Sequence, residues 1–156
     1  MAHELRPPSL DDLGLLASLE GLVAQCRERF NLPVEFYSDG IRQRPTPDVE
    51  LVVYRIVQEA LTNIAKHAGQ CEATVSLRFY RNTLWIRITD NGRGFDQTTL
   101  DRSDGSGLGL FGMHERAALV GGTVTVTSGH NRGTEVEVRV PLGASLPTTA
   151  VGGDQS

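Results

Sequence analysis

The sequence that decides the fold is a glycine-rich stretch that begins DNGRGF at residues 90–95 and ends GSGLGL at residues 105–110. It has almost no apolar run and is longer than most connections between regular elements. A stretch of this kind is either disordered or a functional loop. The elements on either side of it, and the polar residues that they carry, favour the functional loop.

Two helices and a short strand are expected before this loop. Apolar residues recur every three to four positions over residues 10–30 and again over residues 49–65, which is the period of an amphipathic helix. The second helix should begin at Thr-Pro-Asp (residues 46–48), where a hydroxyl cap precedes a proline, and run to about Ala68. Residues 34–37 alternate in polarity and predict a strand between the helices.

Two β-hairpins and a short helix complete the expected elements. Residues 74–79 and 84–89 alternate in polarity and predict a hairpin that turns across Arg81-Asn82 and leads into the glycine-rich loop. A helix over residues 110–120 should end at a pair of glycines. Residues 123–128 and 134–140 then predict a second hairpin.

The ends of the chain differ from its middle in composition. Two prolines in Arg6-Pro7-Pro8-Ser9 would stop an incoming helix, so this junction is predicted to be a hinge. The last residues are small, polar and rich in glycine, which favours disorder. We therefore expect a linker end or cloning remnant at residues 1–9, one domain at residues 10–142 and a disordered tail at residues 143–156.

Composition restricts the possible functions. A chain of 156 residues that is 39% hydrophobic has room for one α+β or α/β domain. It has no long apolar window and no signal peptide, so a soluble, cytoplasmic chain is expected; whether the full-length protein is anchored in a membrane is left open. A net charge of -4 gives no reason to expect nucleic-acid binding. Cys26 and Cys71 lack the spacing of a zinc site.

The residues around the loop have the chemistry of a nucleotide site. A carboxylate at a strand end, such as Asp90, can accept a hydrogen bond from an exocyclic amine, and Gly92 and Gly94 allow the backbone to approach a flat ring. Gly107 and Gly109 leave amide groups free just before a helix begins, where phosphate is favoured. An adenine nucleotide carries both groups, with adenine at one end and phosphate at the other.

The second helix adds a polar stripe that suits a metal and phosphate. Glu59, Asn63, Lys66 and His67 recur at the spacing of one helical face. The amide oxygen of Asn63 suits Mg²⁺, which prefers few protein ligands beside phosphate oxygens. Taken together with the loop, these residues point to Mg-ATP.

Each feature alone also has an ordinary structural explanation. A glycine cluster is more often a flexible turn than a phosphate loop, and Asn-Gly after a strand is usually a turn. Glu59 and Asn63 would most often be solvated helix surface. Their order and spacing along the chain carry more weight than any one of them.

That order matches a known family. Residues 58–68 (QEALTNIAKHA) resemble the N box of histidine kinases, and residues 90–95 and 105–110 resemble its two glycine boxes. The resemblance covers about residues 9–142 and narrows to the NarX/DesK-type branch of sensor histidine kinases. The narrower match rests on Gly112-Met113-His114-Glu115-Arg116, Gly121-Gly122, Gly133-Thr134 and Val140-Pro141-Leu142.

The resemblance implies a fold and a set of site residues. The fold would be the GHKL (Bergerat) α/β sandwich, a mixed β-sheet covered on one face by helices, with ATP between the second helix and a lid over residues 96–107. Asp90 would hold the adenine amine, helped through water by Thr134, and Asn63 would hold Mg²⁺. The residues that would shape the pocket are Gly92, Gly94, Gly107, Leu108 and Gly109.

The resemblance also assigns the remaining residues of the second helix. Lys66 and His67 would face phosphate. Glu59 occupies the position that orients water in ATP-hydrolysing relatives and ranks below Asn63 as a catalytic candidate.

The partners implied are those of a histidine protein kinase. The segment that begins at His3 superficially resembles an H box, but prolines follow at once, so the phosphate-accepting histidine is expected on dimerisation helices missing from this chain. The full-length protein would be a homodimer that serves a response regulator with a helix-turn-helix output. Nucleic acid is not an expected partner of this chain.

Two other functions stay open. One is a serine kinase of the anti-sigma-factor type in the same superfamily, against which the Leu5-Arg6-Pro7 segment and residues 112–116 argue. The other is a degenerate interaction module without nucleotide, against which Asn63, Asp90 and both glycine boxes argue.

Overall fold

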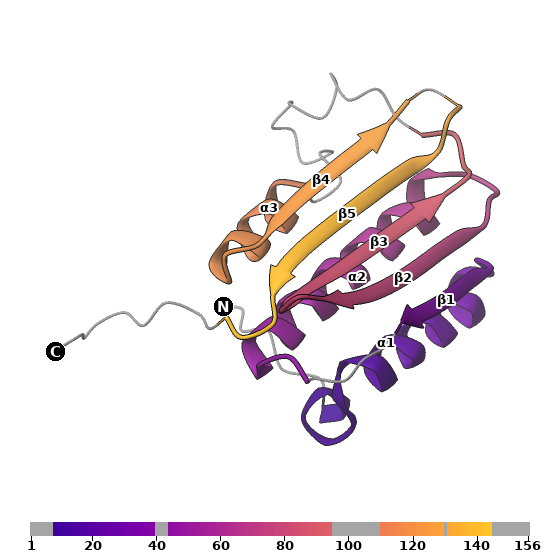
Figure 1. The fold of residues 1–156 in the computed structure, drawn as a ribbon. Helices are drawn as coiled ribbons and strands as arrows, with labels where there is room; N and C mark the ends of the chain where they lie inside the picture. Colours follow the sequence, from indigo (N-terminus) through magenta and orange to yellow (C-terminus); the bar gives the residue numbers. More distant parts are fainter. Residues whose placement is uncertain (1–7, 40–43, 95–109, 130, 145–156) are drawn as a thin grey trace, which may run out of the picture.

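The computed structural model describes residues 8–39, 44–94, 110–129 and 131–144, and these form two layers (Figure 1). One layer is a five-stranded sheet in the order β1-β2-β3-β5-β4, in which β1 and β2 are parallel and the other neighbours antiparallel. The prediction of a mixed sheet covered on one face by helices is confirmed. The elements are α1 (Pro8–Phe30), β1 (Val34–Asp39), α2 (Pro47–His67), β2 (Ala73–Tyr80), β3 (Thr83–Asp90), α3 (Leu110–Leu119), β4 (Thr123–Ser128) and β5 (Thr134–Pro141).

Helix α1 is interrupted near its start. It begins at Pro8, two residues before the predicted start, and Gly14 has φ 88° and ψ 177°, which are not helical. Glycine adopts this positive φ without the steric penalty of a side chain. The apolar spacing did not reveal the break. The hinge predicted at residues 6–9 lies partly outside the described residues and stays a prediction; within them, the helix begins at Pro8 and is interrupted at Gly14.

Helix α2 starts as predicted. Thr46 is the N-cap, and its Oγ1 accepts a hydrogen bond from the backbone N of Val49 at 3.3 Å, while Pro47 is the first helical residue. The Thr46 hydroxyl also donates to the carbonyl of Ala144 at 2.5 Å, which ties the helix start to the end of the domain. A cap of this kind stabilises a helix by about 1 kcal/mol.

The start of α2 also carries a buried carboxylate. Glu50 has a side chain only 1% exposed, and its Oε2 accepts hydrogen bonds from Arg44 Nε at 3.0 Å and from the backbone N of Leu15 at 3.3 Å. Arg44 Nη2 in turn donates to the carbonyl of Leu10 at 2.7 Å. These bonds cross the break at Gly14 and hold both parts of α1 against α2. We refer to the pair as the Arg44–Glu50 clasp.

The first hairpin turns through two residues, as its sequence predicts. Arg81 and Asn82 have φ of 51° and 63°, and Tyr80 pairs with Thr83 across the turn. Positive φ at both central residues matches the twist of the flanking strands. The hairpin therefore closes in register and brings Asp90 to the end of β3 beside Ala73.

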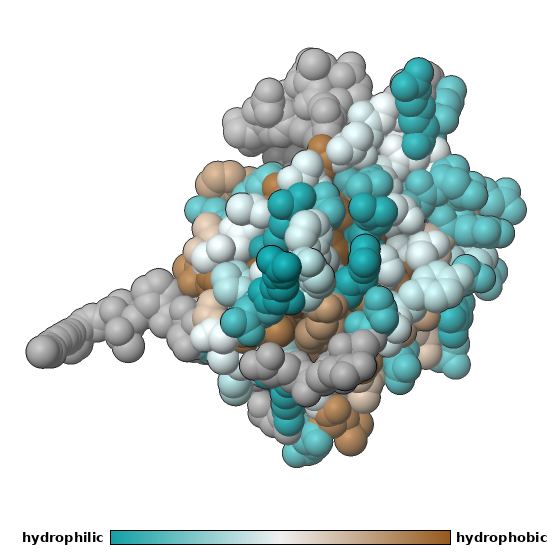
Figure 2. Space-filling model, viewed as in Figure 1, coloured by the Kyte–Doolittle hydropathy of each residue, from teal (hydrophilic) through white to brown (hydrophobic). Residues whose placement is uncertain are grey.

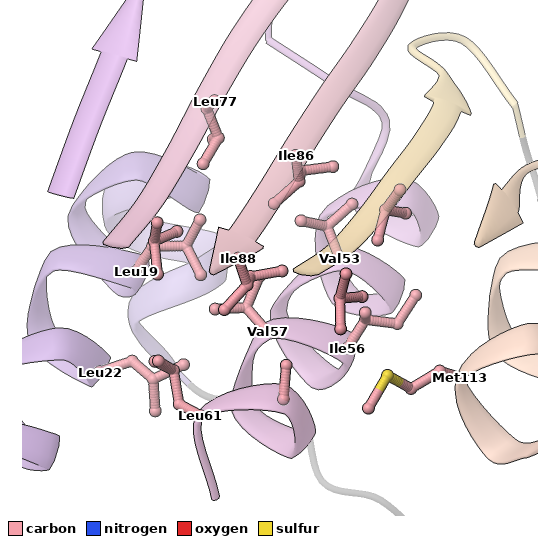
Figure 3. Close-up of a cluster of buried hydrophobic side chains, with 14 of the residues drawn as sticks. Leu19, Leu22, Val53, Ile56, Val57, Leu61, Leu77, Ile86, Ile88 and Met113 are labelled. Atoms are coloured by element: carbon pink, nitrogen blue, oxygen red, sulfur yellow. The ribbon is translucent and has the colours of Figure 1, made fainter. Parts of the chain in front are cut away.

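The core lies between the helices and one face of the sheet (Figure 3). Helix α2 lies in the middle of the helical layer and packs on both α1 and α3 as well as on β3 and β5. Apolar residues of β2 and β3 alternate toward it, because successive strand residues point to opposite faces. The labelled members of the cluster are Leu19, Leu22, Val53, Ile56, Val57, Leu61, Leu77, Ile86, Ile88 and Met113.

The opposite face of the sheet has no helix over it in the described part of the chain and is largely polar (Figure 2). Arg87 pairs with Glu135 at 3.6 Å and Glu137 at 3.8 Å. The guanidinium of Arg139 lies 4.2 Å from the centre of the Trp85 ring. Trp85 therefore lies against Arg139 on this face of the sheet. None of the described helices has the length and apolar character that crossing a membrane requires.

Candidate nucleotide-binding site

Asp90 occupies a partly buried position at the end of β3. Residues Leu84, Ile86 and Ile88 of this strand are buried against the helices, so Asp90, two residues further on, lies on the same face. Its Oδ1 accepts a hydrogen bond from the backbone N of Gly92 at 2.7 Å. Burial raises the pKa of Asp90, while the backbone N–H groups of Gly92 and Thr134 oppose this rise. The carboxylate is thus fixed in place and partly desolvated.

The loop after Asp90 packs directly on the end of α2. The backbone N of Arg93 donates to the carbonyl of Ala68 at 2.9 Å, and a Cβ on Gly92 would lie 2.5 Å from that carbonyl oxygen. Asn91 anchors the other side, since its Oδ1 accepts from the backbone N of Glu72 at 2.8 Å. Only glycine at position 92 allows this close approach.

The turn between β4 and β5 closes over the same loop. The backbone N of Asn131 donates to the carbonyl of Arg93 at 2.5 Å. Gly94 has φ 66°, and a Cβ there would lie 2.1 Å from the carbonyl oxygen of Gly129. Gly133 has φ 74°, and a Cβ there would lie 2.1 Å from the carbonyl oxygen of Asp90. Glycines therefore let three backbone segments meet at this corner of the sheet.

Thr134 lies beside Asp90 in the sheet. The register pairs Asp90 with Thr134, and Thr134 with Ser128 of β4, so the three form one row across β3, β5 and β4. The hydroxyls of Ser128 and Thr134 are 2.9 Å apart. Ser128 was not among the predicted site residues, although the strand register around residues 131–133 could have placed it opposite Thr134.

A cavity of about 320 Å³ opens at these strand ends. Asp90, Ser128 and Thr134 line it, but no residue of α2 does. The cavity thus contains Asp90 and Thr134, the predicted contacts to the base, but none of the predicted residues of α2, and the predicted lid at residues 96–107 lies outside the described residues. The described residues that line it are Thr89, Asp90, Thr127, Ser128, Gly129, Arg132, Gly133, Thr134 and Glu135.

The predicted residues of α2 lie just before the contact with the Asp90 loop. Glu59 and Asn63 are partly buried, whereas Lys66 and His67 are exposed in the last turn. Ala68, which bonds to Arg93, follows directly, so the same helix end carries the polar stripe and touches the loop. The other predicted pocket residues, Gly107, Leu108 and Gly109, lie outside the described residues.

This donor set fits Mg-ATP better than a metal held by protein alone. The described residues contain no group of three or more His, Cys, Asp or Glu that could hold a metal ion. An Mg²⁺ ion here would take the oxygen of Asn63 and complete its shell with phosphate and water. Asp90 offers the partly buried carboxylate that an exocyclic amine needs, and the close backbone packing at Gly92 and Gly94 holds the loop that carries it.

A two-layer domain with a fixed Asp-Gly loop against the end of its central helix is the architecture of a GHKL-type nucleotide-binding domain. The chain belongs to the histidine kinase-, DNA gyrase B-, and HSP90-like ATPase family, whose model matches residues 48–144. It is accordingly an ATP-binding domain of that family, and it has relatives among the sensor histidine kinases.

One of these relatives is the oxygen sensor histidine kinase NreB of Staphylococcus carnosus (strain TM300), which is 45% identical over 142 residues. The match covers 91% of this chain and 40% of that protein, so the chain spans less than half the length of this relative.

Solved structures show the same fold at low sequence identity. The catalytic domain of the histidine kinase ThkA superposes with a TM-score of 0.66 at 13% identity and covers 90% of this chain and 97% of its own. The histidine kinase domain of the blue-light activated kinase EL346 of Erythrobacter litoralis gives a TM-score of 0.64 at 22% identity. That match covers 82% of this chain and 61% of the other.

Proposed function

We propose that this domain transfers the γ-phosphoryl group of Mg-ATP to a histidine on helices outside this chain, for relay to the aspartate of a response regulator. The observation that carries the proposal is the corner at Asp90, where glycines hold a partly buried carboxylate against the end of α2. The identity of 45% with a sensor histidine kinase supports the choice of acceptor.

In this proposal Asp90 recognises the adenine base. Its backbone partners, Gly92 and Thr134, hold the carboxylate in one orientation, so it can accept from an exocyclic amine without reorganising. Gly92 and Gly94 let the ring approach the backbone, and Thr134 contributes through a bound water.

The phosphate end of the site lies along α2 in this proposal. Asn63 holds Mg²⁺, which when bound neutralises charge on the phosphate oxygens, and Lys66 and His67 face the phosphates. Gly107, Leu108 and Gly109 provide backbone amides. Phosphoryl transfer depends mainly on positioning and charge stabilisation, which a site with so few reactive side chains can supply. Glu59 is a secondary candidate for orienting the acceptor.

The partners in this proposal are those of a sensor histidine kinase. The acceptor histidine lies on dimerisation helices outside this chain, the full-length protein is a homodimer, and its product is read by a response regulator of the helix-turn-helix output type. The 45% identity with a sensor histidine kinase over 142 residues supports these partners.

The experiment is a phosphorylation assay on the full-length protein that contains this chain. Radiolabelled Mg-ATP should give a protein-bound phosphate that is labile in acid and stable in base, as a phosphohistidine is. The Asn63→Ala variant should lose most of this label. Acid-stable label on serine would instead support the anti-sigma-factor type of kinase, and absence of label with intact nucleotide binding would contradict histidine transfer.

A further inference from the structure

The hydroxyl groups of Ser128 and Thr134 form a pair next to Asp90. Ser128 ends β4 and Thr134 begins β5, and the two are register partners. Their oxygens are 2.9 Å apart, and either hydroxyl could be the donor in that contact alone. A second contact decides the direction. Ser128 Oγ also lies 2.9 Å from the carbonyl oxygen of Gly133.

Counting protons assigns the donor in each contact. A carbonyl oxygen can only accept, so the bond to Gly133 uses the proton of Ser128. A serine hydroxyl has one proton, and therefore Ser128 must accept in its contact with Thr134. Thr134 donates its own single proton to Ser128. The Thr134 oxygen then offers only lone pairs to any further partner.

This leaves the side chains of Asp90 and Thr134, which meet the base in the proposed function, with acceptors only. Ionised Asp90 cannot donate, and Thr134 has already used its proton. An exocyclic amine, as in adenine, can donate to either group or to a water that bridges them. A ring carbonyl at the same position, as in hypoxanthine or guanine, finds no donor on these two side chains. An unpaired acceptor in a desolvated site is unfavourable.

We propose that Ser128 is a specificity-determining residue, which holds Thr134 as a hydrogen-bond acceptor and so makes the site reject bases with a carbonyl in place of the adenine amine. The inference rests on the proposed function, because it assumes that Asp90 and Thr134 meet the base. It adds that the discrimination depends on a residue that need not touch the nucleotide. Asp90 recognises the amine, and Ser128 excludes the carbonyl.

The test compares ADP with inosine diphosphate, in which a carbonyl replaces the amine and the adjacent ring nitrogen N1 carries a proton. In Ser128→Ala, Thr134 loses its acceptor and can turn its proton toward the base. The ratio of the two dissociation constants, measured by calorimetry, should shrink about fivefold, mainly because inosine diphosphate binds more tightly. Ser128→Thr keeps a hydroxyl and should retain most of the ratio. Ser38→Ala, an exposed serine on β1, should leave it unchanged.

A double variant separates the proton from a general loosening of the turn. Ser128→Ala combined with Thr134→Val has no hydroxyl at either position, so neither side chain can donate to the carbonyl of inosine diphosphate. The ratio of the two dissociation constants should therefore return toward the parental value. The role of Ser128 would be overturned if the ratio of the two dissociation constants were the same in Ser128→Ala and the parent. It would also be overturned if the double variant kept the smaller ratio of Ser128→Ala. Failure of the parent to bind ADP would instead contradict the proposed function itself.

Discussion

The two ends of α2 are held by different means. Its start is fixed by side chains, namely the cap hydroxyl of Thr46 and the Arg44–Glu50 clasp, with Glu50 almost completely buried. Its end is fixed by backbone, since Ala68 bonds to Arg93 and packs on Gly92. At the start of α2 polar side chains therefore hold the fold, whereas at its end the backbone does so and the side chains of Lys66 and His67 are exposed.

The largest expected effect is at the glycine corner. Gly94→Ala places a Cβ near the carbonyls of Gly129 and Gly133 at a positive φ, so we expect a loss of about 3 kcal/mol in unfolding free energy together with loss of nucleotide binding. Chemical denaturation measures the first and calorimetry the second. Gly112→Ala on α3, where a Cβ meets nothing within 4 Å, should be neutral or slightly stabilising. Equal stability of the two variants would contradict the close packing at Gly94.

The clasp should affect stability and not binding. Glu50→Ala removes the carboxylate that accepts from Arg44 and from the backbone N of Leu15, which should lower the free energy of unfolding by about 2 kcal/mol. The cost is below that of a fully buried pair because 55% of the Arg44 side chain is exposed. Glu28→Ala, on the exposed face of α1, is the matched control. A variant that is fully folded but binds ADP much more weakly would show that the two ends of α2 are not separate.

The sequence predicted local structure better than contacts between distant segments. The start of α2 was readable because Thr46 and Pro47 act on neighbouring residues, and the Arg81-Asn82 turn was readable for the same reason. The clasp was not readable, because the contact of Glu50 with Leu15 joins residues 35 positions apart. Nor was the break at Gly14, where the positive φ depends on packing that no periodicity encodes.

The candidate site was predictable in part for the same physical reason. Asp90, Gly92 and Gly94 stand together in the sequence and stand together in the fold. The contacts of Ala68 and Ser128 were not predicted from the sequence, because Ala68 lies at the end of a helix and Ser128 on an edge strand, both distant from Asp90 along the chain. The strand order, which brings β5 between β3 and β4, did not follow from the periodicity of the sequence.

Asn63 should control the response to magnesium. If its amide oxygen holds Mg²⁺, Asn63→Ala should bind ADP with the same affinity in the presence and absence of Mg²⁺, whereas the parent should bind more tightly with the ion. Titrations at matched ionic strength measure this. Gln25→Ala, which removes an exposed amide from α1, should behave as the parent. The same magnesium response in Asn63→Ala would remove the residue from the metal site.

The smallest expected effect is a pH dependence. Because burial raises the pKa of Asp90 above its value in the unfolded chain, the free domain should lose some stability as pH rises from the ordinary aspartate pKa through the raised one. Nucleotide binding should change in the opposite direction, since the amine needs the ionised form. ADP affinity should fall as pH drops through the raised pKa. If the fall in ADP affinity at low pH persists in Asp90→Asn, a group other than Asp90 causes it.

The most direct test of the central claim is a calorimetric titration of Asp90→Asn with ADP and Mg²⁺ beside the parent. A charge-assisted hydrogen bond is worth about 1.5 to 3 kcal/mol, so the affinity should fall about tenfold or more. Stability should be kept or raised, since a partly buried charge is removed. Asp39→Asn, an exposed aspartate on β1, should bind ADP as the parent does. An unchanged dissociation constant in Asp90→Asn would contradict the assignment of Asp90 to the base.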